Sequence, residues 1–367
     1  MLRFHSLRVA QVQAHAEDAV ALALEVPAEL AAEYRGVAGQ HVVLRATLAG
    51  EEVRRTYSLV NAPGEPLLRI VVRVHSDGRL STHLAQHVRP GDLLEVLPPN
   101  GSFTPHAAAG RGTCVAFAAG CGITPVVSIA RSWLETAPTG RVILFYGNRA
   151  MARAMCLEEL LALKDRYLDR LSLHFLMSRE PQEAEIYNGR LDAEHIRQLG
   201  ASFFAPAEIA ECFVCGPGDM IDTVSHTLRQ LGVQSDRIRA EHFTVATANV
   251  TQAQGSAPPP QMAEPGRAGG PDPALAEVTI VMDGRRRSFT MPMNGETILD
   301  AAARAGLDLP FSCRAGVCST CRTKVVRGEV AMDQNYALEE WELQQGYVLA
   351  CQSRVKTPVL ELDYDEV

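Results

Sequence analysis

Four cysteines near the carboxyl end of the chain constrain its fold more than any other feature. Cys313, Cys318 and Cys321 follow the spacing C-x4-C-x2-C, and 29 residues separate Cys321 from Cys351. This spacing is typical of the four thiolate ligands of a [2Fe–2S] cluster. Gly316 lies inside the loop and can take a positive φ, which lets backbone N–H groups face the cluster. The pattern therefore predicts an iron–sulfur site held by these four cysteines.

The alternatives are a structural zinc site or a set of buried thiols. Zinc sites favour paired C-x2-C units, whereas Cys351 stands alone at the end of the apolar segment 347–351. We therefore expect the cluster. The segment Gly295-Glu-Thr-Ile-Leu-Asp-Ala-Ala-Ala303 precedes the loop, and with it this region resembles plant-type ferredoxins. The resemblance implies a β-grasp, ferredoxin-like α+β domain over residues 277–367.

The first part of the chain, residues 1–107, has the pattern of an antiparallel barrel. Its clearest strand-like segments are 20–26, 41–46, 67–74 and 93–97. Turn signals such as Pro90-Gly91-Asp92 separate these segments. Several short strands at such spacing are typical of an all-β barrel.

The pattern changes after residue 107 to strand, glycine-rich turn and helix. Apolar strands are expected at 113–119, 141–146, 171–177 and 212–215, with helices between them. Alternating strands and helices predict a parallel sheet with its ligand at the carboxyl ends of the strands, here over residues 108–245. Residues 246–276 are rich in Ala, Gln, Gly and Pro and are expected to form a linker. The whole is a multidomain protein.

Charge and cysteine usage exclude several classes of protein. The chain has 367 residues, with 35 Lys and Arg against 43 Asp and Glu, a net charge of −8 that argues against a general nucleic-acid binder. No run of 18 apolar residues is present, so no membrane span is expected. Five further cysteines stand singly, which favours a reducing, cytoplasmic location: Cys114, Cys121, Cys156, Cys212 and Cys215.

Two polar motifs in the predicted barrel suit a flat, phosphorylated ligand. In Arg55-Thr-Tyr57-Ser58, a cation can pair with a pyrophosphate, an aromatic ring can stack and a hydroxyl can bond a ring nitrogen. The second motif, Gly78-Arg-Leu-Ser81-Thr82, enters a predicted helix whose N-terminus can bind phosphate. The alternatives are a core tyrosine in the first motif and a plain N-cap at Ser81 in the second.

These motifs precede Gly120-x-Gly122-Ile-Thr124-Pro, Cys215-Gly-Pro and Glu241-x-Phe243, and the ordered set resembles the ferredoxin–NADP reductase superfamily over residues 3–245. The resemblance implies that FAD is held by Arg55, Tyr57, Ser58, Val72, Val74, Gly78, Ser81 and Thr82. It implies that the nicotinamide nucleotide is cradled by Gly120, Gly122, Thr124, Cys215 and Gly216. The residues nearest the reacting rings are then Ser58, Cys215 and Glu241, with Phe243 closing the flavin side.

The same resemblance allows a prediction of coenzyme preference. Arg149 follows the second strand of the nucleotide domain, and Ser178 and Arg179 follow the third, where the adenosine ribose lies in that family. Arginine suits a 2′-phosphate, so NADPH is expected over NADH. The alternative is that both arginines are solvated loop residues. Cys121 stands where the family usually has Ser or Thr. Because a thiol is a weaker hydrogen-bond donor, phosphate binding is expected to be weaker there. The alternative is that Cys121 is a buried small hydrophobic residue.

With a flavin unit first and an iron–sulfur unit last, the chain is similar to the reductase components of bacterial oxygenases. Several segments are most similar to reductase subunits of phenylacetyl-CoA epoxidase complexes, which act in aerobic phenylacetate degradation: 54–59, 145–149, 241–243, 328–336 and 346–352. The resemblance implies an NAD(P)H-dependent oxidoreductase that passes electrons through FAD and the cluster to the oxygenase subunits of a multicomponent monooxygenase. The alternatives are the reductase of another aromatic-ring oxygenase and, in a different class, a redox-sensing scaffold.

Two expectations concern how the cluster domain meets its partners. Five basic residues lie close in sequence to the cluster ligands and predict a basic rim, unless they are scattered surface residues: Arg314, Arg322, Lys324, Arg327 and Arg354. The linker is long enough for the cluster domain to shuttle between flavin and oxygenase. The alternative is a passive spacer with one docked arrangement.

Overall fold

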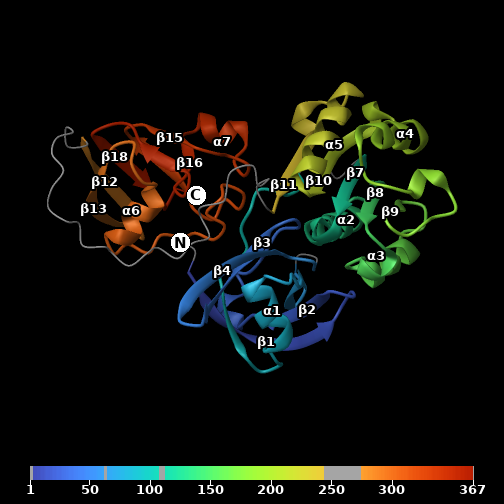
Figure 1. The fold of residues 1–367 in the computed structure, drawn as a ribbon, viewed down its shortest axis with the longest axis horizontal. Coiled ribbons are helices and arrows are strands. Elements are labelled where there is room, and N and C mark those ends of the chain that lie inside the picture. Colours follow the sequence, from blue (N-terminus) through green and yellow to red (C-terminus); the bar gives the residue numbers. More distant parts are fainter. Residues whose placement is uncertain (1–2, 62–63, 107–111, 244–273, 367) are drawn as a thin grey trace.

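A computed structural model describes residues 3–61, 64–106, 112–243 and 274–366. Most of the predicted linker, residues 246–273, lies outside these ranges. The described residues form three units, each built around its own sheet (Figure 1). Within the described residues, every helix is too short or too polar to cross a membrane.

The first unit is an antiparallel barrel. Its six strands lie in the order β4-β3-β6-β1-β2-β5. Their bounds are β1 His5–Ala14, β2 Ala19–Glu25, β3 His41–Leu48, β4 Glu51–Ser58, β5 Leu67–Arg73 and β6 Leu93–Val96, with helix α1 at Arg79–Gln86 and a 3-10 turn at Ala28–Leu30. A bridge between Leu59 and Ile70 joins the two edges, so the end of β4 runs beside β5. This arrangement brings the two predicted FAD motifs together.

The second unit is a parallel sheet of order β11-β10-β7-β8-β9. Its strands are β7 Thr113–Ala119, β8 Arg141–Asn148, β9 Leu171–Met177, β10 Ile209–Gly216 and β11 Ile238–His242. Its helices are α2 Ile123–Thr136, α3 Leu157–Arg166, α4 Ala193–Phe203 and α5 Gly218–Gln230. Short 3-10 turns lie at Gly120–Gly122, Met151–Arg153, Glu185–Tyr187, Pro206–Glu208 and Ser235–Arg237. The central strands are continuous apolar runs because both faces of the sheet are buried.

The third unit holds the four cysteines. It consists of β12 Leu275–Met282, β13 Arg285–Pro292, α6 Ile298–Arg304, β14 Arg322–Arg327, β15 Val330–Met332, α7 Glu340–Gln344, β16 Tyr347–Leu349, β17 Ser353–Val355 and β18 Val359–Asp363. The mixed sheet β13-β12-β18-β14-β16, with α6 packed against it, is the expected β-grasp. A separate two-stranded sheet, β15-β17, completes this unit, and the three units together confirm the predicted fold class.

One boundary prediction is wrong in detail. The predicted linker includes Leu275 and Ala276, but both belong to β12 and pair with Pro292 and Met291. Ala276 is fully buried, because it continues the inward-facing alternation of the strand with Val278 and Ile280.

Candidate functional site

The four cysteines predicted to bind a cluster lie together in the third unit. Cys313, Cys318 and Cys321 come from the loop that precedes β14, and Cys351 follows β16. The contact with Cys313 and burial raise the pKa of Cys318, whereas the contacts that Cys318 and Cys351 make with Cys313 lower the pKa of Cys313. Cys321 in turn contacts Cys351. The four sulfur atoms therefore form one connected group.

The loop around these sulfurs suits an anionic cluster. The Ala315 N–H donates to Cys313 Sγ at 3.3 Å, and the Gln352 side-chain amide donates to Cys351 Sγ at 3.6 Å. Gly316 has φ +74°, and a β-carbon there would lie 3.0 Å from the Gln334 carbonyl oxygen. Such inward-facing donors stabilise thiolates and sulfides. The residues present fit the iron–sulfur group.

The spread of the sulfurs also separates the cluster from zinc. Sulfur ligands about 2.3 Å from one tetrahedral zinc lie less than about 4 Å apart. Among the described residues, the one group of three potential ligands whose atoms all lie within 4.8 Å of one another is His15, Cys156 and Glu159. The four cysteines predicted to bind the cluster, all of them described, form no such group, as expected if two iron ions share them.

The predicted FAD residues gather where β4, β5 and α1 meet. Arg55 lies beside Tyr57, whose pKa is raised by burial and lowered in part by that arginine. Tyr57 also packs partly against the barrel core. Ser58 is buried at the end of β4, and Val72 and Val74 lie on and just after β5. The cation, ring and hydroxyl are therefore brought to one end of the barrel.

The N-terminus of α1 is built for close approach to an anion. Its N-cap is Gly78, not Ser81, so the alternative of a serine cap is wrong. A β-carbon on Gly78 would lie 2.2 Å from Ser81 Oγ, so a larger residue there would require the Ser81 hydroxyl to move. Ser81 donates to the Gly78 carbonyl and Thr82 to the His75 carbonyl, at 3.2 and 3.4 Å. The first N–H groups of the helix have no acceptor within the helix, which suits a phosphate.

The glycine-rich turn of the second unit packs tightly against a neighbouring strand end. Gly120 has φ +57°, and a β-carbon on Gly122 would lie 2.1 Å from the Cys215 carbonyl oxygen. The Thr124 hydroxyl donates to the Cys121 carbonyl at 2.9 Å. Burial raises the pKa of the Cys121 thiol, so the thiol is neutral at neutral pH. At Gly216, a β-carbon would lie 2.8 Å from the Met220 methyl carbon, a contact that the flexible Met220 side chain could relieve.

The residues predicted to lie nearest the reacting rings form a row of neighbours. Ser58 pairs with His41 between β4 and β3, and His41 Nδ1 lies 3.7 Å from Glu241 Oε1. Glu241 pairs with Cys215 between β11 and β10. Burial raises the pKa of Glu241, which the contact with His41 partly offsets. The structure thus brings Ser58, Glu241 and Cys215 together across two units, and Phe243, just after β11, packs partly against the apolar core nearby.

The residues proposed for coenzyme choice lie farther along the same sheet edge. Arg149 and Arg179 are adjacent, because the Arg179 N–H donates to the Arg149 carbonyl at 2.9 Å, and Ser178 pairs with Asn148 in the same way. Both arginines are exposed, and no ion pair of either side chain is found in the described part of the chain. Two exposed arginines on neighbouring strand ends suit a phosphate.

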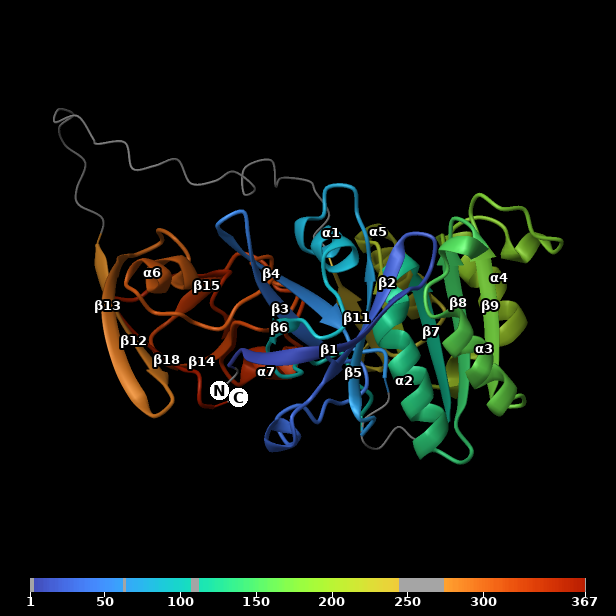
Figure 2. The same ribbon diagram turned by 90° about the horizontal axis from the view of Figure 1, so that it is seen from below.

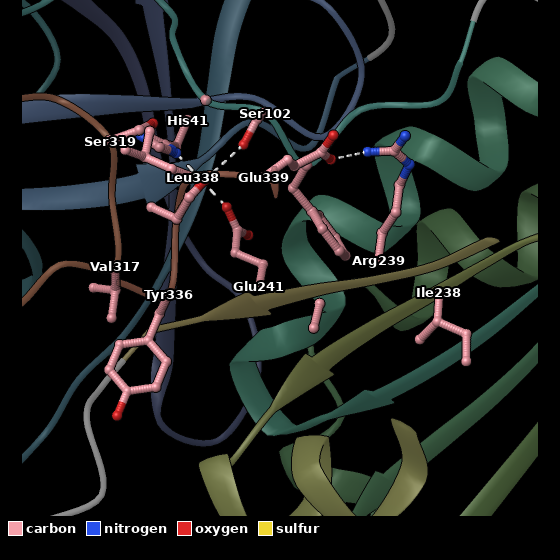
Figure 3. A pocket seen from close by; sticks show the side chains of 14 residues that line it. His41, Ser102, Ile238, Arg239, Glu241, Val317, Ser319, Tyr336, Leu338 and Glu339 are labelled. Atoms are coloured by element: carbon pink, nitrogen blue, oxygen red, sulfur yellow. Dashed lines mark hydrogen bonds and ion pairs between the residues drawn. The ribbon is translucent and has the colours of Figure 1, made fainter. Parts of the chain in front are cut away.

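The site also contains residues that sequence reasoning missed. A cavity of about 160 Å³ lies where the three units meet, with His41 and Ser102 from the barrel, Arg239 and Glu241 from β11, and Ser319 from the cluster loop in its wall. Figure 3 shows Arg239 reaching toward Glu339 and Glu241 toward His41. No motif signals His41 or Arg239 in the sequence, because their roles depend on neighbours from other units.

The predicted basic rim of the cluster is not supported. Four of its five cations are paired with carboxylates of their own unit: Arg314 with Asp300, Arg322 with Glu342, Lys324 with Glu366 and Arg354 with Asp333. The local charge is therefore largely neutralised. The sequence could not show this, because each partner is distant along the chain.

Comparison with known proteins identifies all three units. Residues 6–104 match the oxidoreductase FAD-binding domain, residues 117–226 the oxidoreductase NAD-binding domain and residues 280–356 the 2Fe-2S iron-sulfur cluster binding domain. The chain is 39% identical to one of the subunits of the 1,2-phenylacetyl-CoA epoxidase of Escherichia coli K12, over 100% of this chain and 99% of that protein. It is 33% identical to the ferredoxin reductase component of 3-ketosteroid-9-alpha-monooxygenase of Rhodococcus rhodochrous, over 98% and 96%. The chain belongs to the reductase components of oxygenases.

This reductase is accordingly an oxidoreductase with FAD, nicotinamide-nucleotide and [2Fe–2S] domains, as predicted. Its fold also matches a solved structure titled phthalate dioxygenase reductase, with TM-score 0.58, 24% identity and 98% coverage of both chains. At that identity the likeness concerns the fold alone.

Proposed function

We propose that this reductase serves a phenylacetyl-CoA epoxidase, passing electrons from NADPH through FAD and the [2Fe–2S] cluster to the oxygenase component in aerobic phenylacetate degradation. The observation that carries the proposal is the end-to-end similarity to the epoxidase protein of Escherichia coli K12, at 39% identity. We place the enzyme in the cytoplasm, with domains at 1–107 and 108–245 and a cluster domain that begins with β12 at Leu275.

When bound, the flavin takes an electron pair as hydride from reduced nicotinamide and the cluster carries single electrons onward. The chain's residues position these groups. Arg55 and the N-terminus of α1 would hold the FAD pyrophosphate, and Tyr57 would flank the ring. The close packing of Gly122 on Cys215 would let the nucleotide approach the strand ends. Ser58, Glu241 and Cys215 would border the space between the two rings.

NADPH is favoured because Arg149 and Arg179 lie together, exposed and unpaired among the described residues. Arg179→Ala should raise the KM for NADPH about tenfold or more and leave the KM for NADH nearly unchanged, since one charge-assisted contact is worth about 1.5–3 kcal/mol. Arg166→Ala removes an exposed arginine from α3 and serves as the matched control. An equal rise in the KM for NADPH and for NADH would contradict the role of Arg179 in binding the 2′-phosphate.

The second candidate is a reductase for another oxygenase. It is supported by the 33% identity to the ferredoxin reductase component of 3-ketosteroid-9-alpha-monooxygenase. The deciding experiment is copurification of the native complex, with identification of the bound oxygenase subunits. Recovery of epoxidase subunits and NADPH-dependent turnover of phenylacetyl-CoA support the proposal. Recovery of a different oxygenase, with no epoxidase turnover, replaces it with the second candidate.

A further inference from the structure

The two faces of strand β4 in the barrel contact different units: one faces the barrel core and the other faces the cluster unit. In β4, Val53 belongs to the barrel core and Tyr57 packs against it. Because side chains alternate along a strand, Arg54, Thr56 and Ser58 lie on the opposite face. Two views show β4 beside the unit that holds the cluster (Figures 1 and 2).

Arg54 and Thr56 contact the segment that leads into the first cluster ligand. Arg54 Nη2 lies 3.2 Å from Asp308 Oδ1, and its guanidinium carbon lies 4.0 Å above the Phe311 ring. Thr56 Oγ1 lies 2.8 Å from Ser312 Oγ. Ser312 immediately precedes Cys313.

One partner of each contact is buried at this junction, while Asp308 itself is mostly exposed. Arg54 is 7% exposed and Ser312 is 7% exposed, so the junction buries both. A buried guanidinium that has an ion pair and an aromatic face is held in one geometry. The hydroxyl pair adds directionality, because a hydrogen bond is lost when its partners shift by less than 1 Å.

A second anchor lies on the other side of the cluster loop. The Ser102 hydroxyl donates to the Ala337 carbonyl at 3.1 Å, and Arg239 pairs with Glu339. If these were the contacts that held the cluster unit, the loop between residues 313 and 321 could rotate about them. The β4 contacts supply the fixed point next to Cys313.

The spacing along β4 links this fixed point to the flavin side. Ser58 lies two residues beyond Thr56, a separation of about 7 Å along a strand. We propose that Thr56 and Arg54 are positioning residues that set the cluster loop against the flavin, so that electrons cross from flavin to cluster beside β4. This inference rests on the proposed electron path from flavin to cluster.

The test compares two phases of reduction in the intact holoenzyme after anaerobic mixing with NADPH. In the double variant Arg54→Met/Thr56→Val, flavin reduction and ferricyanide reduction should stay within about twofold of the unaltered enzyme. Bleaching of the cluster absorbance should slow by about tenfold or more, because small displacements of reacting groups have effects of that order. The single variant Thr56→Ser keeps the hydroxyl, and its rate of cluster bleaching should stay close to that of the unaltered enzyme.

A readout independent of turnover is amide hydrogen exchange. Exchange should rise in residues 53–58 and 308–312 of the double variant. The matched control is Thr279→Val, which removes a similar hydroxyl pair, Thr279 with Ser288 at 2.9 Å, away from the junction. It should change neither readout.

Two results overturn the proposal: an unchanged rate of cluster bleaching in the double variant, or an equal slowing of flavin reduction. The proposed function fails differently, because then NADPH would not reduce the cluster of the unaltered enzyme. A variant that loses flavin or cluster absorbance is replaced by the single variant Thr56→Val, for which the same two results decide.

Discussion

The barrel contacts the nucleotide unit at one junction and the cluster unit at another, and the two junctions differ in the kind of contact. Toward the nucleotide unit, Val71 and Phe103 join one apolar core with Ile123 and Phe213, and the rings of Phe103 and Phe213 meet edge to face at 5.3 Å. Toward the cluster unit, the contacts are side-chain hydrogen bonds, ion pairs and ring contacts. The apolar core of the cluster unit contains no described residue of the other two units. One junction is a shared interior, and the other is a docked surface.

The neighbouring residues Ser102 and Phe103 show the contrast at its smallest scale. Ser102 bonds the cluster unit, whereas Phe103 is buried against the nucleotide unit. Apolar burial is lost in full on separation, at about 25 cal/mol per Å². Polar contacts are exchanged for contacts with water at small net cost. The flavin and nucleotide units should therefore act as one body, and the cluster unit should be separable.

Buried polar atoms at the docked junction strengthen this view. A cavity of about 410 Å³ is lined by Asn100, Arg322 and Tyr364. The Asn100 amide and Tyr364 Oη have no hydrogen-bond partner among the described residues, and Arg322 Nε has an ion pair with Glu342 as its partner. A cavity of this size with such polar atoms in its wall has room for bridging water. A wet junction is compatible with a cluster unit that docks and leaves, as the shuttle hypothesis requires, although the linker itself lies outside the described residues.

The largest expected effect tests whether the two sides function separately. Cys318→Ser should abolish the iron–sulfur absorbance and oxygenase reduction, while NADPH-dependent ferricyanide reduction stays near normal. The reason is that Cys318 lies in the cluster unit and contributes nothing to the shared apolar core. Visible spectra and the two assays check this. Loss of ferricyanide reduction as well would show that the docked surface supports the flavin unit.

A stability comparison of adjacent residues comes next in size. Phe103→Ala should lower the unfolding free energy by about 3–5 kcal/mol, because it leaves a cavity in the shared core. Ser102→Ala should cost about 0.5–1.5 kcal/mol, the net value of one hydrogen bond. Urea unfolding of the holoenzyme followed by flavin fluorescence measures both. Similar losses in the two variants would mean that the two junctions do not differ as described.

Ionic strength should act on one junction and not on the other. Arg239 pairs with Glu339 across the docked surface, and salt screens this pair in part because Glu339 is partly exposed. Raising salt should slow flavin-to-cluster transfer by about twofold to fivefold and leave hydride transfer to the flavin unchanged. In Arg239→Gln the transfer should be slower at low salt and less dependent on salt. A transfer rate that salt does not change would point to apolar docking.

Sequence reasoning reached the local features and missed the contacts between units. The cysteine spacing, the glycine turns and the strand–helix alternation depend on neighbouring residues, so the three sheets and the family could be predicted. The short strand β11, which carries Arg239 and Glu241, has no clear periodicity, so the sequence does not predict it as a strand. His41, Arg54 and Thr56 were missed because a charge or hydroxyl gains its role from a partner on another unit. The same reason explains the wrong expectation of a basic rim.

The smallest expected effect is a pH dependence at the docked junction. Glu211 on β10 lies 3.9 Å from Arg239 and accepts from the His106 N–H at 2.9 Å. Burial raises its pKa, with a further contribution from Glu339 across the junction, while the His106 N–H, Arg239 and the His106 ring partly oppose the rise. The folded state therefore binds a proton more tightly than the unfolded state does.

It follows that the unfolding free energy should fall as pH rises from about 4.5 through the raised pKa of Glu211, and that this contribution should be constant at higher pH. Glu211→Gln removes this dependence of the unfolding free energy on pH, which amounts to about 1.4 kcal/mol per unit of pKa shift. Glu339→Gln should shift the same window to lower pH, because it removes a neighbouring negative charge. Thermal unfolding between pH 5 and 8, taken as differences from the unaltered enzyme, measures both. If Glu339→Gln leaves the window in place, Glu339 and Glu211 are not coupled across the junction.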